Sequence, residues 1–166
     1  MVCHIREKFT INKNTLLRRY IKPEDVEKYV SGEYDAVRGC ISREGDCNDV
    51  GDFEDIFETF RLDYDNTPYH STDKSYWKIE FKSIQDDLKK INLDNTYGKE
   101  FGGLNEDINP CTRNGYTGAK NGKVIPEWNL KEGIGYDKAL ITKIENGKIV
   151  KQYKYIKNEK IWRKIK

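Results

Sequence analysis

A chain of 166 residues has the length of one domain, since domains commonly contain about 100 to 150 residues, and we predict a single domain over residues 1–166. Thirty Lys and Arg residues nearly balance 28 Asp and Glu residues, which excludes a broad positive field that would gather nucleic acid over the whole surface. The apolar runs are far shorter than the roughly 20 residues that span a bilayer, so we expect neither a membrane segment nor a signal peptide.

The N-terminal third of the chain predicts strands around one short helix. Residues 8–11 are strand-like, and residues 15–21, TLLRRYI, are typical of a buried strand that carries two arginines. Pro23 suits the first turn of a helix, and Gly32 provides a stop signal. Residues 36–42, AVRGCIS, alternate well enough to form the next strand.

The middle of the chain predicts an amphipathic helix, a loop and a strand. Asp49 is taken as the cap of a helix whose apolar residues recur on one face. These residues are Phe53, Ile56, Phe57 and Phe60. Turn-forming residues fill positions 61–74, which predicts a surface loop. Residues 77–82 alternate apolar and charged side chains, which predicts a strand with one buried and one solvated face, and a short helix over residues 84–91 is expected next.

The C-terminal half predicts a long loop followed by a hairpin. Residues 92–122 carry six glycines without sustained periodicity, and a loop of this length predicts a lid or a binding loop. Residues 139–144 and 149–156 flank an Asn-Gly turn and predict a β-hairpin. A last short strand is expected around residues 161–165. The predicted elements together indicate an α+β fold.

The residues available for chemistry are few. Only His4 and His70 are present, so a ribonuclease with two catalytic histidines would need both in one site. The four cysteines form no C-x-x-C pair and are interpreted as reduced thiols, with Cys40 buried in a strand, and no metal site is expected. The chain also lacks glycine-rich nucleotide-binding motifs. The remaining chemistry depends on an arginine, a hydroxyl and a carboxylate.

Three segments resemble, in this order along the chain, the small ADP-ribosyltransferase-like toxin domains of bacteria. They are residues 17–42 (LRRYIKPEDVEKYVSGEYDAVRGCIS), residues 76–83 (YWKIEFKS) and residues 109–128 (NPCTRNGYTGAKNGKVIPEW), which together cover 54 of the 166 positions. The resemblance implies two small antiparallel sheets that form a cleft for NAD, with short helices and no metal. NAD would be the substrate.

The resemblance also implies roles for individual residues. Arg19 would hold the NAD pyrophosphate with its guanidinium fork, and Arg18 competes for this role because strand alternation places only one of them in the cleft. Ser42 would orient the nicotinamide ribose, and Glu127 would polarise the ribose 2′-hydroxyl as the catalytic glutamate. The family often has Glu or Gln where this chain has Ile125, so transfer to an acceptor and simple NAD hydrolysis both stay open.

Further residues complete the implied cofactor site. Gly39 would contribute to the cofactor site, and its neighbour Arg38 is a second candidate for anion binding, less favoured than Arg19. Tyr116 and Thr117 would stack on nicotinamide and bond its amide. The basic residues near the C-terminus predict mainly a solvated face, with nucleic-acid binding as the less favoured alternative. They are Lys151, Lys154, Lys157, Lys160, Arg163, Lys164 and Lys166.

The implied function is that of a toxin domain that uses NAD to modify an unknown macromolecule, or hydrolyses NAD, in the cytosol of a target cell. A producing bacterium would secrete or deliver it without a signal peptide of its own and would hold it inactive with a cognate immunity protein. Two alternatives stay open. One is a metal-independent ribonuclease toxin that uses Lys, Arg, His70 and Glu, and the other is a non-enzymatic module that binds another protein through its Gly- and Asn-rich loop.

Overall fold

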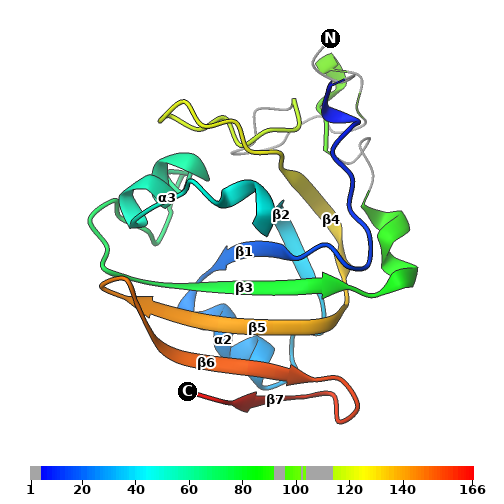
Figure 1. Ribbon diagram of the computed structural model, residues 1–166, viewed down its shortest axis with the longest axis vertical. Helices are drawn as coiled ribbons and strands as arrows, with labels where there is room; N and C mark the ends of the chain where they lie inside the picture. Colours follow the sequence, from blue (N-terminus) through cyan, green and yellow to red (C-terminus); the bar gives the residue numbers. More distant parts are fainter. Residues whose placement is uncertain (1–4, 92–95, 102, 104–113) are drawn as a thin grey trace.

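A computed structural model of the chain describes residues 5–91, 96–101, 103 and 114–166. Its centre is a seven-stranded sheet in the order β4-β2-β1-β3-β5-β6-β7, with antiparallel pairing between neighbours (Figure 1). The strands are β1 (Leu17–Ile21), β2 (Val37–Arg43), β3 (Ser75–Ser83), β4 (Trp128–Ile134), β5 (Tyr136–Glu145), β6 (Lys148–Ile156) and β7 (Ile161–Lys164). The helices are short: α2 (Pro23–Val30) and α3 (Phe53–Thr59), with 3₁₀ turns η1 (Glu44–Cys47), η2 (Gln85–Lys90) and η4 (Lys99–Phe101). The fold is therefore α+β and mainly antiparallel sheet, and none of the described helices is long and apolar enough to cross a membrane.

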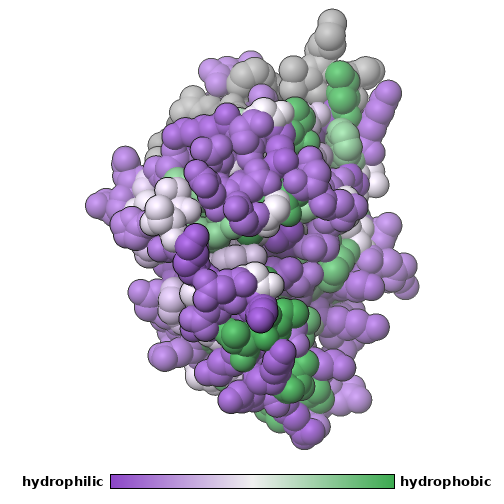
Figure 2. Space-filling model, turned by 60° about the vertical axis from the view of Figure 1, so that its left-hand side comes forward, coloured by the Kyte–Doolittle hydropathy of each residue, from purple (hydrophilic) through white to green (hydrophobic). Residues whose placement is uncertain are grey.

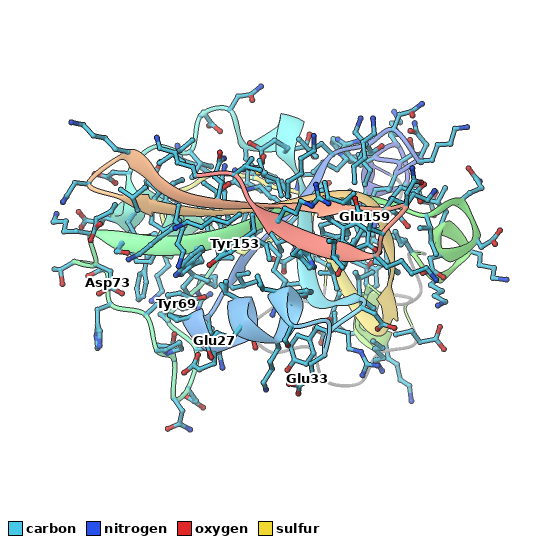
Figure 3. All side chains as sticks on the ribbon, turned by 90° about the horizontal axis from the view of Figure 1, so that it is seen from below. Glu27, Glu33, Tyr69, Asp73, Tyr153 and Glu159 are labelled. Carbon is cyan, nitrogen blue, oxygen red and sulfur yellow. The ribbon has the colours of Figure 1, made fainter. Side chains whose placement is uncertain are left out.

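Strand alternation divides the hydrophobic core between the two faces of the sheet. On one face, Val26 and Tyr29 of α2 pack with the apolar residues of β1, β3 and β5. On the other face, Tyr20 packs with Phe53 and Ile56 of α3. Figure 3 shows α2 below the sheet when the molecule is seen edge-on.

The two helices follow from local sequence signals. Helix α2 begins at Pro23, and Gly32 just after its end adopts φ +82°, as the predicted start and stop signals require. Helix α3 is capped by Asp52, whose side chain accepts a hydrogen bond from the Asp55 amide at 3.1 Å. The predicted cap at Asp49 is therefore wrong, because the cap must directly precede the first helical residue.

Several predicted elements need correction. Residues 8–11 are not a strand, because they pair with no neighbour. The charged face of β3 is not solvated: Lys78 and Glu80 are each 17% exposed and form a 3.0 Å ion pair. The helix over residues 84–91 is a 3₁₀ turn. Cys40 lies in a strand as predicted but is only half-buried.

The C-terminal predictions are confirmed. Strands β5 and β6 form a hairpin whose turn residues Asn146 and Gly147 both have positive φ. Strand β7 then pairs with β6, and residues 61–74 form the predicted loop. Of the loop predicted over residues 92–122, residues 92–95, 102 and 104–113 lie outside the described residues, and the described remainder contains no helix or strand beyond the 3₁₀ turn η4. Strand β4 was not predicted.

The junction between β1 and β2 determines where the site lies. Only two residue pairs join these strands, Leu17–Arg43 and Arg18–Ser42. Beyond Arg18 the strands separate, so β2 and β4 form one part of the sheet and the other five strands form the second part. The side chain of Arg19 reaches across this opening to the Cys40 carbonyl of β2.

Candidate functional site

A cavity of about 390 Å³ opens where β1 and β2 separate. Its lining includes Arg19 from β1, Gly39 and Cys40 from β2, and Glu127 just before β4. The loop that follows α3 contributes Arg61, among others. A smaller cavity of about 50 Å³ adjoins it and shares Arg19, Cys40 and Glu127. Residues that are far apart in the sequence thus surround one space that has both polar and apolar walls.

Arg19 and Gly39 fit together directly. Nη1 of Arg19 donates a hydrogen bond to the Cys40 carbonyl at 2.9 Å. Gly39 has φ +86°, and a Cβ at this position would lie 2.6 Å from Nη1 of Arg19. The absent side chain makes room for the guanidinium, and the positive φ bends β2 around it. Gly39 therefore positions Arg19 at the opening.

Ser42 and Glu127 are brought together by strand register. Ile41 lies opposite Trp128 in the pairing of β2 with β4, so the next position places Glu127 opposite Ser42. Their side chains are 2% and 6% exposed, and both line the small cavity together with Arg19. The three predicted catalytic residues therefore share one cavity, although 108 positions separate Arg19 from Glu127.

Arg18 and Arg19 have different environments. Arg18 is 7% exposed, donates to the Tyr20 hydroxyl and forms a 3.3 Å ion pair with Glu44. Its guanidinium also lies over the rings of Tyr20 and Phe60. Arg18 lines the small cavity but not the larger one, whereas Arg19 lines both. Arg19 is thus the more accessible cation, and Arg18 is held within the fold.

Arg6 is a site residue that the sequence reasoning missed. It is wholly buried, with its guanidinium carbon 3.8 Å from the centre of the Trp128 ring. Its Nε donates to the Gly115 carbonyl at 2.7 Å, and its Nη2 donates to the Glu127 carbonyl at 3.1 Å. Burial lowers the pKa of Arg6 to about 10. Arg6 thus holds the backbone on which the Glu127 side chain stands, and no periodicity in the sequence signals this contact.

Tyr116 and Thr117 lie apart from the cavity. The Tyr116 ring packs edge-on against Phe9, with 6.4 Å between ring centres, and its backbone pairs with Pro126. Thr117 is buried, and its amide donates to the Ile125 carbonyl. Within the described part of the chain, neither residue is brought to the lining of the two cavities. Their predicted contacts with nicotinamide do not follow from this arrangement.

Arg38 is exposed and lines a separate cavity of about 460 Å³, which also includes Arg19 and Asp25. This second space lies on the α2 side, because Tyr29 of α2 contributes to it. Arg19 therefore lines this cavity as well as the two cavities beside Glu127, whereas Arg38 lines neither of those two.

The other reactive side chains lie elsewhere. His70 is exposed in the loop before β3 and does not line the cavities that the described residues form around Glu127, and His4 is outside the described residues. Burial raises the pKa of the Cys47 thiol to about 11, so this thiol is protonated and unreactive at neutral pH. In the described ranges, no cluster of His, Cys, Asp and Glu could hold a metal ion.

Asp63 fixes the loop that covers the larger cavity. Its carboxylate accepts from Nε of Arg61 at 2.9 Å and lies 2.5 Å from the Lys120 ammonium. The hydrogen bond from Arg61 lowers the pKa of Asp63 to about 2. The loop after α3 is thereby joined to the glycine-rich segment that precedes β4.

Comparison of the chain with protein-family models, with curated proteins and with solved structures found no match. Function is therefore argued from the geometry of the cavity and from the motifs in the sequence.

Proposed function

We propose that this chain is an ADP-ribosyltransferase-like toxin domain that consumes NAD in the cavity between β1 and β2. The observation that supports the proposal is the shared lining of the small cavity by Arg19, Ser42 and Glu127. These are the three residue types that the resemblance requires, and they come from three different strands or strand ends. The larger adjoining cavity offers room for a bound ligand.

The reaction breaks the bond between the nicotinamide nitrogen and C1′ of its ribose. The bonding electrons leave with nicotinamide, and positive charge develops on the sugar. The Glu127 carboxylate, 6% exposed, supplies a fixed negative charge and accepts a hydrogen bond from the 2′-hydroxyl. The nucleophile of the acceptor then bonds to C1′ and loses its proton. When water takes the place of the acceptor, the same steps hydrolyse NAD.

Arg19 and Ser42 bind and orient the substrate in this proposal. A guanidinium has five N–H groups in a planar fork that matches phosphate oxygens, and Arg19 donates to a single carbonyl, that of Cys40, in the described part of the chain. Arg19 therefore keeps donors for the pyrophosphate. The Ser42 hydroxyl, directly opposite Arg18 and beside Glu127, orients the ribose.

The acceptor and partners in this proposal come from the family resemblance. They are a macromolecule in the cytosol of a target cell and an immunity protein that blocks the domain in the producer. The ribonuclease alternative is the weaker one, because the exposed His70 lies away from the cavity that holds Glu127. The cavity itself favours an enzyme over a binding module.

The test compares Glu127→Gln with Glu132→Gln. Both variants remove one carboxylate near β4, but Glu132 is exposed and lines neither of the two cavities. We expect nicotinamide release from NAD to fall by about 10² or more in Glu127→Gln, with little change in NAD affinity, because the charge acts mainly in the transition state. Glu132→Gln should behave as the wild type. Equal nicotinamide release by both variants would contradict the proposed role, and cleavage of tRNA or rRNA without NAD would favour the ribonuclease.

A further inference from the structure

The C-terminal strands carry a local excess of positive charge. Residues 148–166 carry eight Lys and Arg residues against one Glu, a formal charge of +7, whereas residues 1–147 sum to −5. The basic segment forms β6 and β7, at one edge of the sheet. Lysines on edge strands often serve to prevent aggregation, so charge alone assigns no ligand.

Cross-strand pairing adds an independent observation. Three pairs in this region place two cations directly opposite each other. They are Lys82–Lys138 between β3 and β5, Lys143–Lys151 between β5 and β6, and Lys154–Arg163 between β6 and β7. Directly opposite like charges destabilise a sheet. The Lys82–Lys138 pair joins two interior strands, so edge protection does not account for it. The fold tolerates a repulsion that a bound polyanion would relieve.

Four of these cations share one face of the sheet, which we call the basic face: Lys82, Lys138, Lys154 and Arg163. Leu140 shows that Lys138 and Lys154 lie on the same face. It is directly opposite Lys154 in the neighbouring strand, and it is two residues from Lys138 along β5, so all three side chains point to one side of the sheet. Lys138 and Lys154 are exposed and have no carboxylate partner within the described ranges, whereas Arg163 bonds Glu159. Two fully available cations therefore stand on adjacent strands.

The basic face is opposite the face that α2 covers. Ile79 and Ile141, which pack with α2, alternate along their strands with the residues that belong to the basic face. Glu27 and Glu33 lie on the α2 side (Figure 3). No described helix stands in front of β5, β6 and β7 on the basic face (Figure 1). A polyanion can thus approach β5, β6 and β7 from the side opposite α2, and the acidic residues of α3 on the basic face, such as Glu54, lie over β1 and β3 instead.

We propose that the basic face binds the phosphodiester backbone of a nucleic acid. Protein interfaces are poor in Lys and rich in aromatic anchors, but here the cations are mostly Lys, and the exposed large hydrophobic side chains of the described residues are all aliphatic. Phosphates contacted by Lys and Arg release counterions, which favours binding without any specific base contact. Backbone phosphates placed between the opposed cations would also remove the cross-strand repulsion.

The inference goes beyond the proposed function and does not depend on it. The residues Ser42, Arg18, Glu80, Leu140, Lys154 and Arg163 form one cross-strand row on this face. Five steps between neighbouring strands of about 4.8 Å make this row about 24 Å long. If the proposed reaction holds, a nucleic acid on the basic face would lie within reach of the cavity as its acceptor.

An anionic membrane is the competing surface. Ile149, Val150 and Ile165 are exposed near the lysines of β6 and β7. Figure 2 shows hydrophobic residues among hydrophilic ones in the lower part of the molecule, where Figure 1 places these strands. Vesicles that contain phosphatidylserine therefore form one arm of the test.

The test uses Lys138→Glu/Lys154→Glu with Lys74→Glu/Lys131→Glu as the matched control. The control residues are exposed and change the net charge equally, but Lys74 precedes β3 at its far end and Lys131 lies on β4, at the opposite edge from β7. Binding is measured by fluorescence anisotropy with labelled RNA, single-stranded DNA and duplex DNA, between about 50 and 200 mM salt. NAD is absent throughout, so failure of the proposed function cannot affect the result.

We expect the wild type to bind at least one of the three nucleic acids. Comparison of its affinities for the three probes then shows whether RNA or DNA is preferred. The Lys138→Glu/Lys154→Glu variant should lose about tenfold or more in affinity, and the slope of log K against log salt should fall by about 1.4 to 1.8 for two lost contacts. The same variant should melt at an equal or higher temperature, because each new carboxylate faces a cation across the strands. The control should bind as the wild type does. Absence of wild-type binding at low salt, equal weakening in both variants, or binding to the vesicles alone would each overturn the proposal.

Discussion

Replacing Arg6 with Met tests whether a buried guanidinium holds the cavity together. Met keeps an unbranched apolar stem and removes the charge and all N–H donors. The carbonyls of Gly115 and Glu127 then lose their hydrogen bonds from Arg6, and Trp128 loses the cation over its ring. The backbone that carries Glu127 is expected to loosen, and the free energy of unfolding to fall.

The expected fall in the free energy of unfolding of Arg6→Met is the loss of favourable contacts minus the cost of burying the Arg6 charge. Hydrogen bonds to a charged group contribute about 1.5 to 3 kcal/mol each, so the bonds to Gly115 and Glu127 are worth about 3 to 6 kcal/mol. A third bond, to the Phe9 carbonyl, is long at 3.3 Å and adds little. The ring contact adds about 2 kcal/mol in a desolvated site. Burial lowers the pKa of Arg6 from 12.5 to about 10, which at about 1.4 kcal/mol per pKa unit corresponds to a cost of about 3 kcal/mol. The net loss expected for Arg6→Met is about 2 to 5 kcal/mol.

Urea unfolding followed by tryptophan fluorescence measures this loss, with Lys8→Met as the control. Lys8 lies in the same segment but is exposed, so its replacement should change the free energy of unfolding by less than about 0.5 kcal/mol. Arg6→Lys should fall between Arg6→Met and the wild type, because an ammonium keeps the charge but not the fork. A loss for Arg6→Met as small as that of the control would refute the reasoning.

Three further predictions concern the same region. Gly39→Ala and Gly32→Ala both force Ala to a positive φ, which should lower the free energy of unfolding by about 1 kcal/mol. Only the Cβ of Gly39→Ala would press against Arg19, so only this variant should also bind NAD more weakly in calorimetry. Equal NAD affinity in the two variants would contradict this. Arg19→Lys should weaken NAD binding, whereas Arg18→Lys should mainly lower the melting temperature, and the reverse order would exchange their roles. Asp63→Asn should lose at most about 2 kcal/mol at pH 7, because the hydrogen bond from Arg61 depresses the Asp63 pKa from 3.8 to about 2. A carboxyl group whose pKa is lowered in the folded state stabilises the fold at pH values above its unfolded pKa. The difference in free energy of unfolding between Asp63→Asn and the wild type, measured in urea, should therefore shrink as the pH falls from 4 towards 2. A difference that stays constant with pH would argue against the ion pair.

The elements that the sequence predicted correctly are those with local signals. Pro23 and Gly32 bound a helix whatever surrounds it, and the turn at Asn146 and Gly147 has dihedral angles that few other residue pairs adopt. Strand β4 has no such signal, because its sequence WNLKEGI alternates poorly and its place depends on pairing with β2. The expected strand over residues 8–11 alternates polar and apolar side chains, but its backbone pairs with no strand.

The candidate site depends on contacts that no local pattern contains. Residue type and order along the chain indicated Arg19, Ser42 and Glu127, but their proximity results from the register of β2 against β1 and β4. A shift of one residue in either register would turn Ser42 to the opposite face. The contact of Arg6 with Glu127 spans 121 positions and leaves no trace in hydrophobic periodicity.

The three arginines near the cavity show why position rather than charge decides which one can bind an anion. Arg6 uses its donors on backbone carbonyls, and Arg18 uses its own on Tyr20 and Glu44. Both are buried, so a ligand phosphate could reach them only after these contacts break, and each broken bond to a charged group costs about 1.5 to 3 kcal/mol. Arg19 is only partly buried and gives up at most one bond to a carbonyl. An anion that enters the cavity therefore binds Arg19 at the least cost, whatever reaction follows.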